Sequence, residues 1–142
     1  MNDLVFLAYS FKDIRRARRL RESLRQHGLR VWPDRTLMPG TPDWKTQVQK
    51  RLAEAGCVVV ILSKDAPLSR WVWQIAGDAH HRQIPILPVL MDGDAGHILL
   101  VELEGEDWFD LRWSKNYARE VRYLVDAIRQ YTADATVTIK GR

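Results

Sequence analysis

The side chains that could do chemistry in this chain gather in two short segments, each of which follows an apolar stretch. The first segment reads Tyr9-Ser10-Phe11-Lys12-Asp13, and the second, residues 69–79, carries Ser69, Trp71 and Asp78. One interpretation of the first segment is that Ser10 and Phe11 form one wall of a ligand cleft. Ser10 and Asp13 are also residue types that cap helices, so the first segment has a purely structural interpretation as well.

Other reactive residue types fall in places that exclude several kinds of site. Cys57 is the only cysteine, which excludes an internal disulfide and a cysteine-based zinc site. It begins an apolar run, so we expect a buried thiol. His80 and His81 are adjacent and cannot share one helical face, so we expect no metal site. The chain lacks G-x-G-x-x-G, G-x-x-x-x-G-K-[ST] and G-x-S-x-G runs, which argues against a phosphate-binding loop and a serine hydrolase.

The composition is that of an ordinary globular domain with a basic surface. Hydrophobic residues make up 46% of the 142 positions, which supports one domain with a core of its own. The net charge is +4, and much of the excess comes from arginines within residues 15–25. No aromatic residues interleave with these arginines, so we interpret them as the solvated face of a helix and expect no nucleic-acid partner. No apolar run approaches the roughly 20 residues of a membrane span and no leader pattern is present, so we expect no membrane association and a cytoplasmic location.

Strand and helix patterns alternate along the whole chain and must position these side chains. Apolar runs predict strands at residues 4–9, 29–32, 57–62, 84–90 and 108–111. Apolar residues three and four apart predict helices at residues 10–27, 42–55, 70–81 and 117–128. Such alternation predicts a flavodoxin-like three-layer α/β domain, with helices on both faces of a central five-stranded parallel sheet. We assign residues 1–131 to this domain and residues 132–142 to a C-terminal tail or linker.

Helix-breaking residues predict where the first two helices begin and end. Gly28 should close the first helix after His27, and Gly56 should close the second. Thr41 is the expected N-cap of the second helix, with Pro42 at its first position.

The second half of the chain is less regular. Pro85 and Pro88 interrupt the fourth strand, so this strand should be irregular or close to a sheet edge. Residues 98–104 fit a helix or a strand equally well.

In a parallel sheet of this kind ligands bind at the carboxyl ends of the strands. The loops of interest are therefore residues 9–13, 32–44, 63–71 and 91–97. A receiver-type phosphoacceptor domain shares this architecture but needs acidic residues after its first and third strands. Tyr9-Ser10 and Leu62-Ser63 stand there instead, which excludes that class.

Several segments, taken in chain order, resemble the signatures of TIR domains. Residues 5–13 resemble the family's first box, of the form V-F-I-S-Y-S-x-x-D, and residues 28–34 resemble its second strand. Leu37-Met38-Pro39-Gly40, followed by Trp44, is similar to the BB loop after that strand. Residues 58–63, 69–72, 84–90 and 108–111 resemble the third strand, the S-x-W-V block, the I-I-P-V-L strand and the fifth strand. These segments resemble bacterial members of the family more than animal receptors.

The resemblance implies two kinds of activity. TIR domains self-associate through the BB loop and neighbouring helices to build signalling assemblies, and bacterial members suggest a role in immunity. Many bacterial and plant members also cleave NAD at the nicotinamide–ribose bond. By this resemblance the interface would comprise Leu37, Met38, Pro39, Gly40 and Trp44. The ligand cleft would be lined by Tyr9, Ser10, Phe11, Asp13, Arg35, Pro39, Gly40, Ser69, Trp71 and Ile75.

The glutamate that the family uses to cleave NAD is missing from its expected place. The family motif is W-x-x-x-E, whereas four residues after Trp71 this chain has Ile75, and counting from Trp73 reaches Gly77. Cleavage builds positive charge on the ribose, which a nearby carboxylate stabilises and an isoleucine cannot. Asp78 lies one helical turn beyond Ile75 and is a candidate substitute, although a surface acid or helix-stabilising charge is the simpler interpretation.

Three functions stay open at this point. The first is a non-catalytic TIR module that requires no cofactor and associates with itself or with other TIR domains. The second is an NAD glycohydrolase or cyclase that uses Asp78 or becomes active on assembly, with NAD as substrate. The third is a sensor that binds a nucleotide ligand between Phe11 and Trp71 without cutting it.

Overall fold

The computed structural model describes residues 2–34, 43–93, 108–112 and 116–132. Within them, five parallel strands form one sheet in the order β2-β1-β3-β4-β5. The strands are β1 (Leu4–Ala8), β2 (Arg30–Trp32), β3 (Ala55–Leu62), β4 (Ile86–Leu90) and β5 (Phe109–Asp110). The sheet confirms the predicted flavodoxin-like α/β fold.

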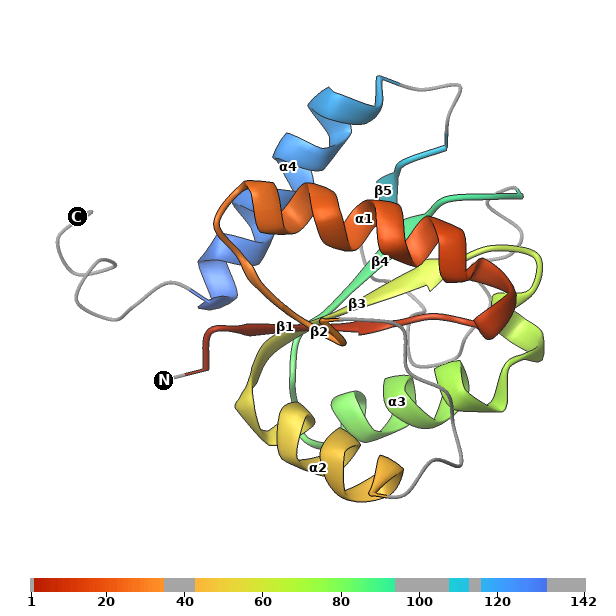
Figure 1. Cartoon of the computed structure of the whole chain (residues 1–142), viewed down its shortest axis with the longest axis vertical. Helices are drawn as coiled ribbons and strands as arrows, with labels where there is room; N and C mark the ends of the chain where they lie inside the picture. Colours follow the sequence, from red (N-terminus) through yellow and green to blue (C-terminus); the bar gives the residue numbers. More distant parts are fainter. Residues whose placement is uncertain (1, 35–42, 94–107, 113–115, 133–142) are drawn as a thin grey trace, which may run out of the picture.

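Within the same described residues, four α-helices lie on the two faces of this sheet. They are α1 (Ile14–Gln26), α2 (Trp44–Glu54), α3 (Arg70–His81) and α4 (Tyr117–Thr132). Two short 3-10 helices, η1 (Phe11–Asp13) and η2 (Ala66–Leu68), precede α1 and α3. Figure 1 shows α1 and α4 on one face of the sheet and α2 and α3 on the other, which makes the three predicted layers.

The core is divided by the sheet because successive side chains of a strand point to opposite faces. Phe6 and Ala8 of β1 pack in the cluster under α2 and α3, whereas Val5 and Leu7 pack in the cluster under α1 and α4. Every residue of β1 and β3 is buried. A strand covered on both faces reads as a continuous apolar run, which is the signal that identified these strands in the sequence.

Two glycines have different roles in these elements. Gly28 has a φ of +82° and follows the C-cap His27, so it closes α1 as predicted. Gly56 does not close α2, because it lies inside β3, which begins at Ala55. A Cβ atom at Gly56 would lie 2.3 Å from the carbonyl oxygen of Asn2 and 2.6 Å from that of Tyr131. This glycine therefore permits a close approach of three backbone segments.

One further expectation about an element is wrong, and another is confirmed. The second helix begins at Trp44, with Asp43 in the N-cap position at a φ of 66°, and not at Pro42 after Thr41. The fourth strand lies one position inside the sheet edge, next to β5. Pro88 is accommodated there because β5 pairs only with the next two residues of β4, Val89 and Leu90.

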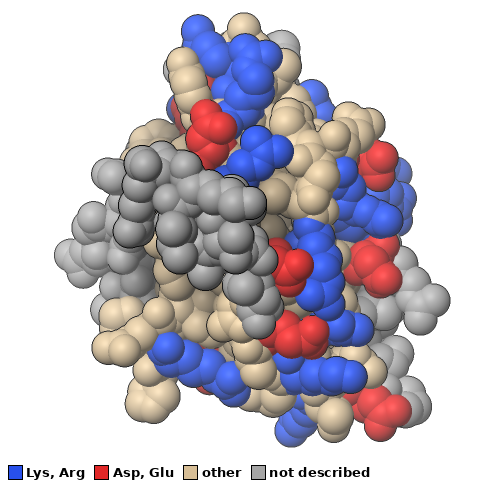
Figure 2. Space-filling model, turned by 90° about the vertical axis from the view of Figure 1, so that its left-hand side faces the viewer, with Lys and Arg blue, Asp and Glu red and all other residues tan. Residues whose placement is uncertain are grey.

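Charged side chains of both signs share the surface. Exposed arginines of α1 form its solvated face, as predicted: Arg15, Arg18, Arg19 and Arg25. On the face drawn in Figure 2, Lys and Arg side chains lie interspersed with Asp and Glu. Arg30, for example, contacts Asp3 at 2.9 Å and Glu54 at 3.2 Å. Within the described residues, no helix is long and apolar enough to cross a membrane.

Several predicted positions lie outside the described residues. They are the loop residues Arg35, Leu37, Met38, Pro39 and Gly40, the ambiguous stretch 98–104, and the segment beyond α4.

Candidate functional site

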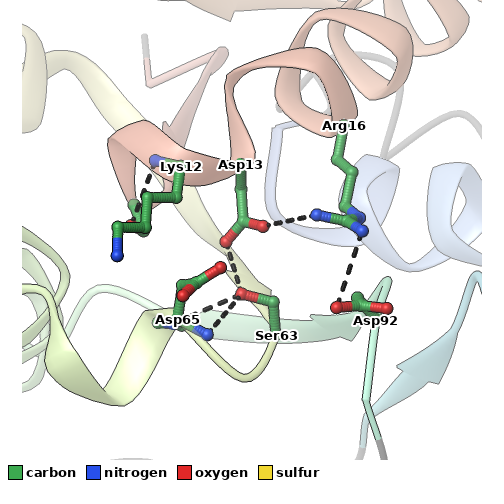
Figure 3. Close-up of polar contacts among 8 residues, drawn as sticks. Lys12, Asp13, Arg16, Ser63, Asp65 and Asp92 are labelled. Carbon is green, nitrogen blue, oxygen red and sulfur yellow. Dashed lines mark hydrogen bonds and ion pairs between the residues drawn. The ribbon is translucent and has the colours of Figure 1, made fainter.

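The carboxyl ends of β1 and β3 meet at the point where the strand order reverses, which is where ligands bind in sheets of this type. Four side chains converge there, and we call them the switch-point cluster: Asp13, Arg16, Ser63 and Asp92. Asp13 follows β1, Ser63 follows β3 and Asp92 follows β4, so three strand ends contribute (Figure 3).

Asp13 is the centre of this cluster and is fully buried. Its Oδ2 accepts a hydrogen bond of 2.5 Å from Ser63 Oγ, and its Oδ1 accepts one of 2.9 Å from Arg16 Nη1. The other terminal nitrogen of Arg16 lies 3.5 Å from Asp92 Oδ2. Both oxygens of Asp13 are therefore engaged by protein groups, and the sequence segment that suggested a ligand site is used to join the loops after β1 and β3.

Ser63 completes the cluster from the other side. Its Oγ accepts hydrogen bonds from the backbone N–H groups of Asp65 at 3.1 Å and Ala66 at 3.2 Å while it donates to Asp13. It therefore fixes the start of the turn at η2. In the sequence Ser63 is recognisable only as the residue after a strand, so its role was not predicted. No local signal connects it to Asp13, which lies 50 residues earlier in the chain.

Burial and hydrogen bonding act in opposite directions on Asp13. Removal from water raises the pKa of its carboxyl group above the ordinary value, and the hydrogen bonds from Ser63 and Arg16 lower it in part. The raised pKa is the net result. Burial likewise raises the pKa of the Cys57 thiol to about 12, which confirms a buried thiol that stays protonated near neutral pH.

A second candidate region lies on the opposite helix layer. A pocket of about 260 Å³ runs along the seam between α2 and α3, and we call it the α2–α3 hollow. Its lining consists of Trp44, Lys45, Val48, Gln49, Trp71, Gln74, Ile75 and Asp78. The predicted residues Trp44, Trp71, Ile75 and Asp78 therefore lie together.

Aromatic rings build one end of this hollow. The Trp44 and Trp71 rings, from the first turns of α2 and α3, have centroids 4.8 Å apart. Phe6 of β1 contacts Trp71 at 6.4 Å and Trp32 at 5.1 Å, so the rings continue down to the sheet. Such tilted pairs add to the apolar burial and hold the starts of the two helices together.

Ile75 and Asp78 differ sharply in their surroundings. Ile75 is 1% exposed and belongs to the core under α2 and α3, together with Val72, Ala76 and Ala79. Asp78 is partly exposed at the hollow, and within the described residues its carboxylate has no hydrogen-bond or ion-pair partner. The position at which the family resemblance expects a glutamate is therefore filled by a core side chain, and the available carboxylate lies one turn farther along α3.

The other predicted site residues that the structure describes do not line the hollow. Tyr9 packs in the cluster under α1 and α4, and the Phe11 ring contacts Tyr9 at 6.2 Å. Phe11 and Trp71 therefore do not form opposite walls of this hollow. Ser10 and Ser69 act as caps: Ser10 Oγ accepts from the N–H of Lys12 at 3.3 Å, and Ser69 Oγ accepts from that of Val72 at 3.3 Å.

Of the two residues expected to cap the first helix, only Ser10 does so, at η1. Asp13 holds the N-cap position of α1 but makes no capping hydrogen bond, because its carboxylate is used in the switch-point cluster. Lys45, Gln49 and Gln74 of the hollow were not singled out in the sequence. In the sequence these three residues are polar positions beside the apolar stripes of α2 and α3. Every surface helix has such positions, so they did not indicate a site.

Solved structures with the same fold share little sequence with this chain. The TIR domain of the Toll-related receptor TRR-2 from Hydra magnipapillata is 19% identical with a TM-score of 0.70, over 91% of this chain and 99% of that one. A metazoan TIR-STING receptor from C. gigas in complex with 2',3'-cGAMP is 21% identical with a TM-score of 0.69. That match covers 87% of this chain but only 38% of the receptor. The TIR domains of the activated Roq1 resistosome are 19% identical with a TM-score of 0.54, over 97% and 95% of the two chains.

The sequence itself identifies the family. No curated protein matches the chain closely. A family model described as TIR domain, however, matches residues 5–125, which is most of the chain and includes both regions described above. The chain therefore belongs to the TIR domain family.

Proposed function

We propose that this TIR domain is a signalling module that acts by homotypic TIR–TIR association and does not cleave NAD with the glutamate of the family. The observation that carries the proposal is Ile75, which occupies the glutamate position and is 1% exposed in the apolar core. An apolar side chain offers no charge to the positive ribose that forms when the glycosidic bond breaks.

Of the two activities that the family resemblance implies, self-association does not need the missing glutamate. Among proteins with this fold, the TIR domains of Roq1 are described within an activated resistosome, which is an assembly. By the family resemblance, the contact would involve the loop that contains Pro39 and Gly40, together with Trp44. Trp44 is half-buried and packs on Trp71, which joins the start of α2 to the start of α3.

The test is the molar mass of the purified protein, measured by size-exclusion chromatography with light scattering over a range of concentrations. We expect the mass of the wild type to rise with concentration and that of Pro39→His to stay at the monomer value. A wild type that is monomeric at every concentration, and that does not change with candidate TIR partners, would contradict the proposal.

A second candidate function, NAD glycohydrolase activity, is favoured by one observation. Asp78 lines the same hollow as Trp71 and Ile75, and its carboxylate has no partner among the described residues. A carboxylate there could orient ribose hydroxyls and stabilise positive charge in place of the missing glutamate.

Nicotinamide release from NAD by concentrated protein separates the two functions. If product forms, Asp78→Asn should abolish it, and Asp126→Asn, an exposed acid on α4, should leave it unchanged. We expect no product from the wild type. A thermal shift with NAD, ADP-ribose or a cyclic nucleotide, without product, would instead indicate a nucleotide sensor.

A further inference from the structure

One side chain of the described residues is strongly apolar and almost entirely in water. Leu68 is 81% exposed, whereas the other large hydrophobic side chains that stand out, Trp108, Tyr123 and Tyr131, are 39 to 55% exposed. Those three also carry a polar atom that water can solvate, which Leu68 lacks. A single exposed leucine is ordinary on a protein surface, so its role depends on how it is held and what it could meet.

Three hydrogen bonds hold the turn that presents Leu68. Trp73 Nε1 donates a hydrogen bond of 2.7 Å to the carbonyl oxygen of Pro67. The N–H of Leu68 bonds to the carbonyl of Asp65 at 3.1 Å, and that of Ser69 bonds to Ala66 at 3.0 Å. The backbone of this projection is thus already ordered, so a partner that covers Leu68 would lose little conformational entropy. We call the segment Pro67-Leu68 the knob.

The α2–α3 hollow is the apolar concavity that can receive such a side chain. Its interior is formed by Val48, Ile75 and the two tryptophan rings, and its volume of about 260 Å³ exceeds what one leucine needs. Leu68 is not among its lining residues, so the knob does not fill the hollow of its own chain.

The charges around the two surfaces are complementary. Lys64 and Arg70 flank the knob and are both exposed, whereas Asp65 in the same turn is partly buried, so the flanking charge is net basic. Asp78 lies at the end of the hollow away from the tryptophan rings, two helical turns along α3, with no partner among the described residues. Lys45 lies at the other end, beside Trp44. An incoming basic side chain would therefore meet its opposite charge at one end only, which sets an orientation.

We propose that the knob of one copy of this chain docks into the α2–α3 hollow of a second copy, with Arg70 of the first beside Asp78 of the second. This inference rests on the proposed self-association and names a contact for it. The two surfaces are different, so the contact is heterologous: each copy in a pair keeps one free knob or one free hollow. Copies therefore add head to tail. The resulting assembly is a ring if the contacts close and a filament if they do not.

Two variants remove one surface each without touching the core. Leu68→Asp places a charge on the knob, and Gln74→Trp fills the mouth of the hollow from an exposed position. Tyr123→Asp on α4 is the matched control, because it makes the same kind of change on the opposite helix layer. All three should melt at nearly the same temperature as the wild type.

Concentration-dependent molar mass gives the readout. We expect Leu68→Asp and Gln74→Trp each to weaken association by about tenfold or more, as removal of a central apolar anchor does, while Tyr123→Asp assembles like the wild type. Mixing Leu68→Asp with Gln74→Trp should restore one knob–hollow contact between a copy of each variant, because one variant keeps its hollow and the other its knob. Arg70→Glu and Asp78→Arg should each weaken assembly, and the double variant should recover it.

The outcomes separate the inference from the proposal beneath it. A wild type that associates while Leu68→Asp associates equally well overturns the knob contact and leaves homotypic association standing. Two weakened variants that fail to form a heterodimer also overturn it, because the contact is then not heterologous. A wild type that is monomeric throughout overturns both.

Discussion

The switch-point cluster and the α2–α3 hollow both bring polar groups to the apolar core of this TIR domain, but the carboxylate in each has a different environment. Asp13 is fully buried, and both of its oxygens accept hydrogen bonds from Ser63 and Arg16. Asp78 is partly exposed and has no side-chain partner within the described residues. A buried carboxylate needs internal partners because it has lost water, whereas an exposed one keeps water and stays available to a ligand or partner. We therefore expect the cluster to contribute stability, whereas our proposals use the hollow for recognition.

The largest expected effect is the restoration of the family's glutamate. Ile75→Glu should lower the free energy of unfolding by on the order of 4 kcal/mol, because the new carboxylate would enter the apolar core with no partner. Urea denaturation measures this loss. Gln74→Glu, one residue earlier and exposed, should change stability by only about 0.5 kcal/mol. An Ile75→Glu protein as stable as the wild type would mean that this position opens to water, and the hollow would then be a catalytic cleft.

The next effect tests the cluster. Ser63→Ala should cost about 2–3 kcal/mol of stability, because it leaves a buried oxygen of Asp13 and two backbone N–H groups without their partner. Chemical denaturation of variant and wild type gives the difference. A loss within experimental error would show that the cluster does not hold the loops after β1 and β3.

Ser69→Ala should have a smaller effect. Ser69 Oγ caps α3 by accepting one hydrogen bond from the N–H of Val72, and loss of such a cap costs about 1 kcal/mol. The same denaturation experiment measures it, and Ser63→Ala is its matched comparison. If Ser69→Ala lowered the free energy of unfolding more than Ser63→Ala, then the cap of α3 would contribute more to stability than the hydrogen bonds of Ser63 in the switch-point cluster.

The smallest effect is a change of slope with pH. The pKa of Asp13 is raised in the folded protein, chiefly by burial. Its contribution to stability is therefore fully present below the ordinary pKa of 3.8 and is lost as pH rises through the higher folded value. The stability of the wild type minus that of Asp13→Asn should thus fall as pH rises through this window, measured by denaturation at several pH values.

Asp126→Asn controls for the loss of one negative charge in that experiment, since Asp126 is exposed on α4. A difference that rises with pH would mean that the hydrogen bonds from Ser63 and Arg16 outweigh burial, and Asp13 would then behave as an ordinary paired carboxylate.

Much of the fold could be predicted because its signals are local. The apolar runs of β1 and β3 follow from burial on both faces, and the spacing of Leu20 and Leu24 follows from the period of a helix. Predictions of helix ends were wrong where the same residue type can serve two different structural purposes. Gly56 was interpreted as a helix end because glycine favours that place, but here it allows the backbone of β3 to approach Asn2 and Tyr131.

The candidate site was predictable only in part for the same reason. Trp71, Ile75 and Asp78 lie on one face of one helix, so their proximity follows from spacing alone. Phe11 and Trp71 come from different elements, and the sheet separates Tyr9, against which Phe11 packs, from the layer of Trp71. No sequence pattern states which of two loops at a sheet edge turns toward which face.

The sequence by itself determined the family, the alternation of strands and helices, and the absence of a glutamate four residues after Trp71, because each of these depends on residues close together in the chain. Only the tertiary structure decided that Asp13 is hydrogen-bonded to Ser63, that Ile75 lies in the core and that Asp78 lines a hollow. These features depend on which distant segments pack against each side chain. The 50 residues between Asp13 and Ser63 are brought together by β1 and β3 pairing in the sheet, and that pairing is set by the packing of the whole domain.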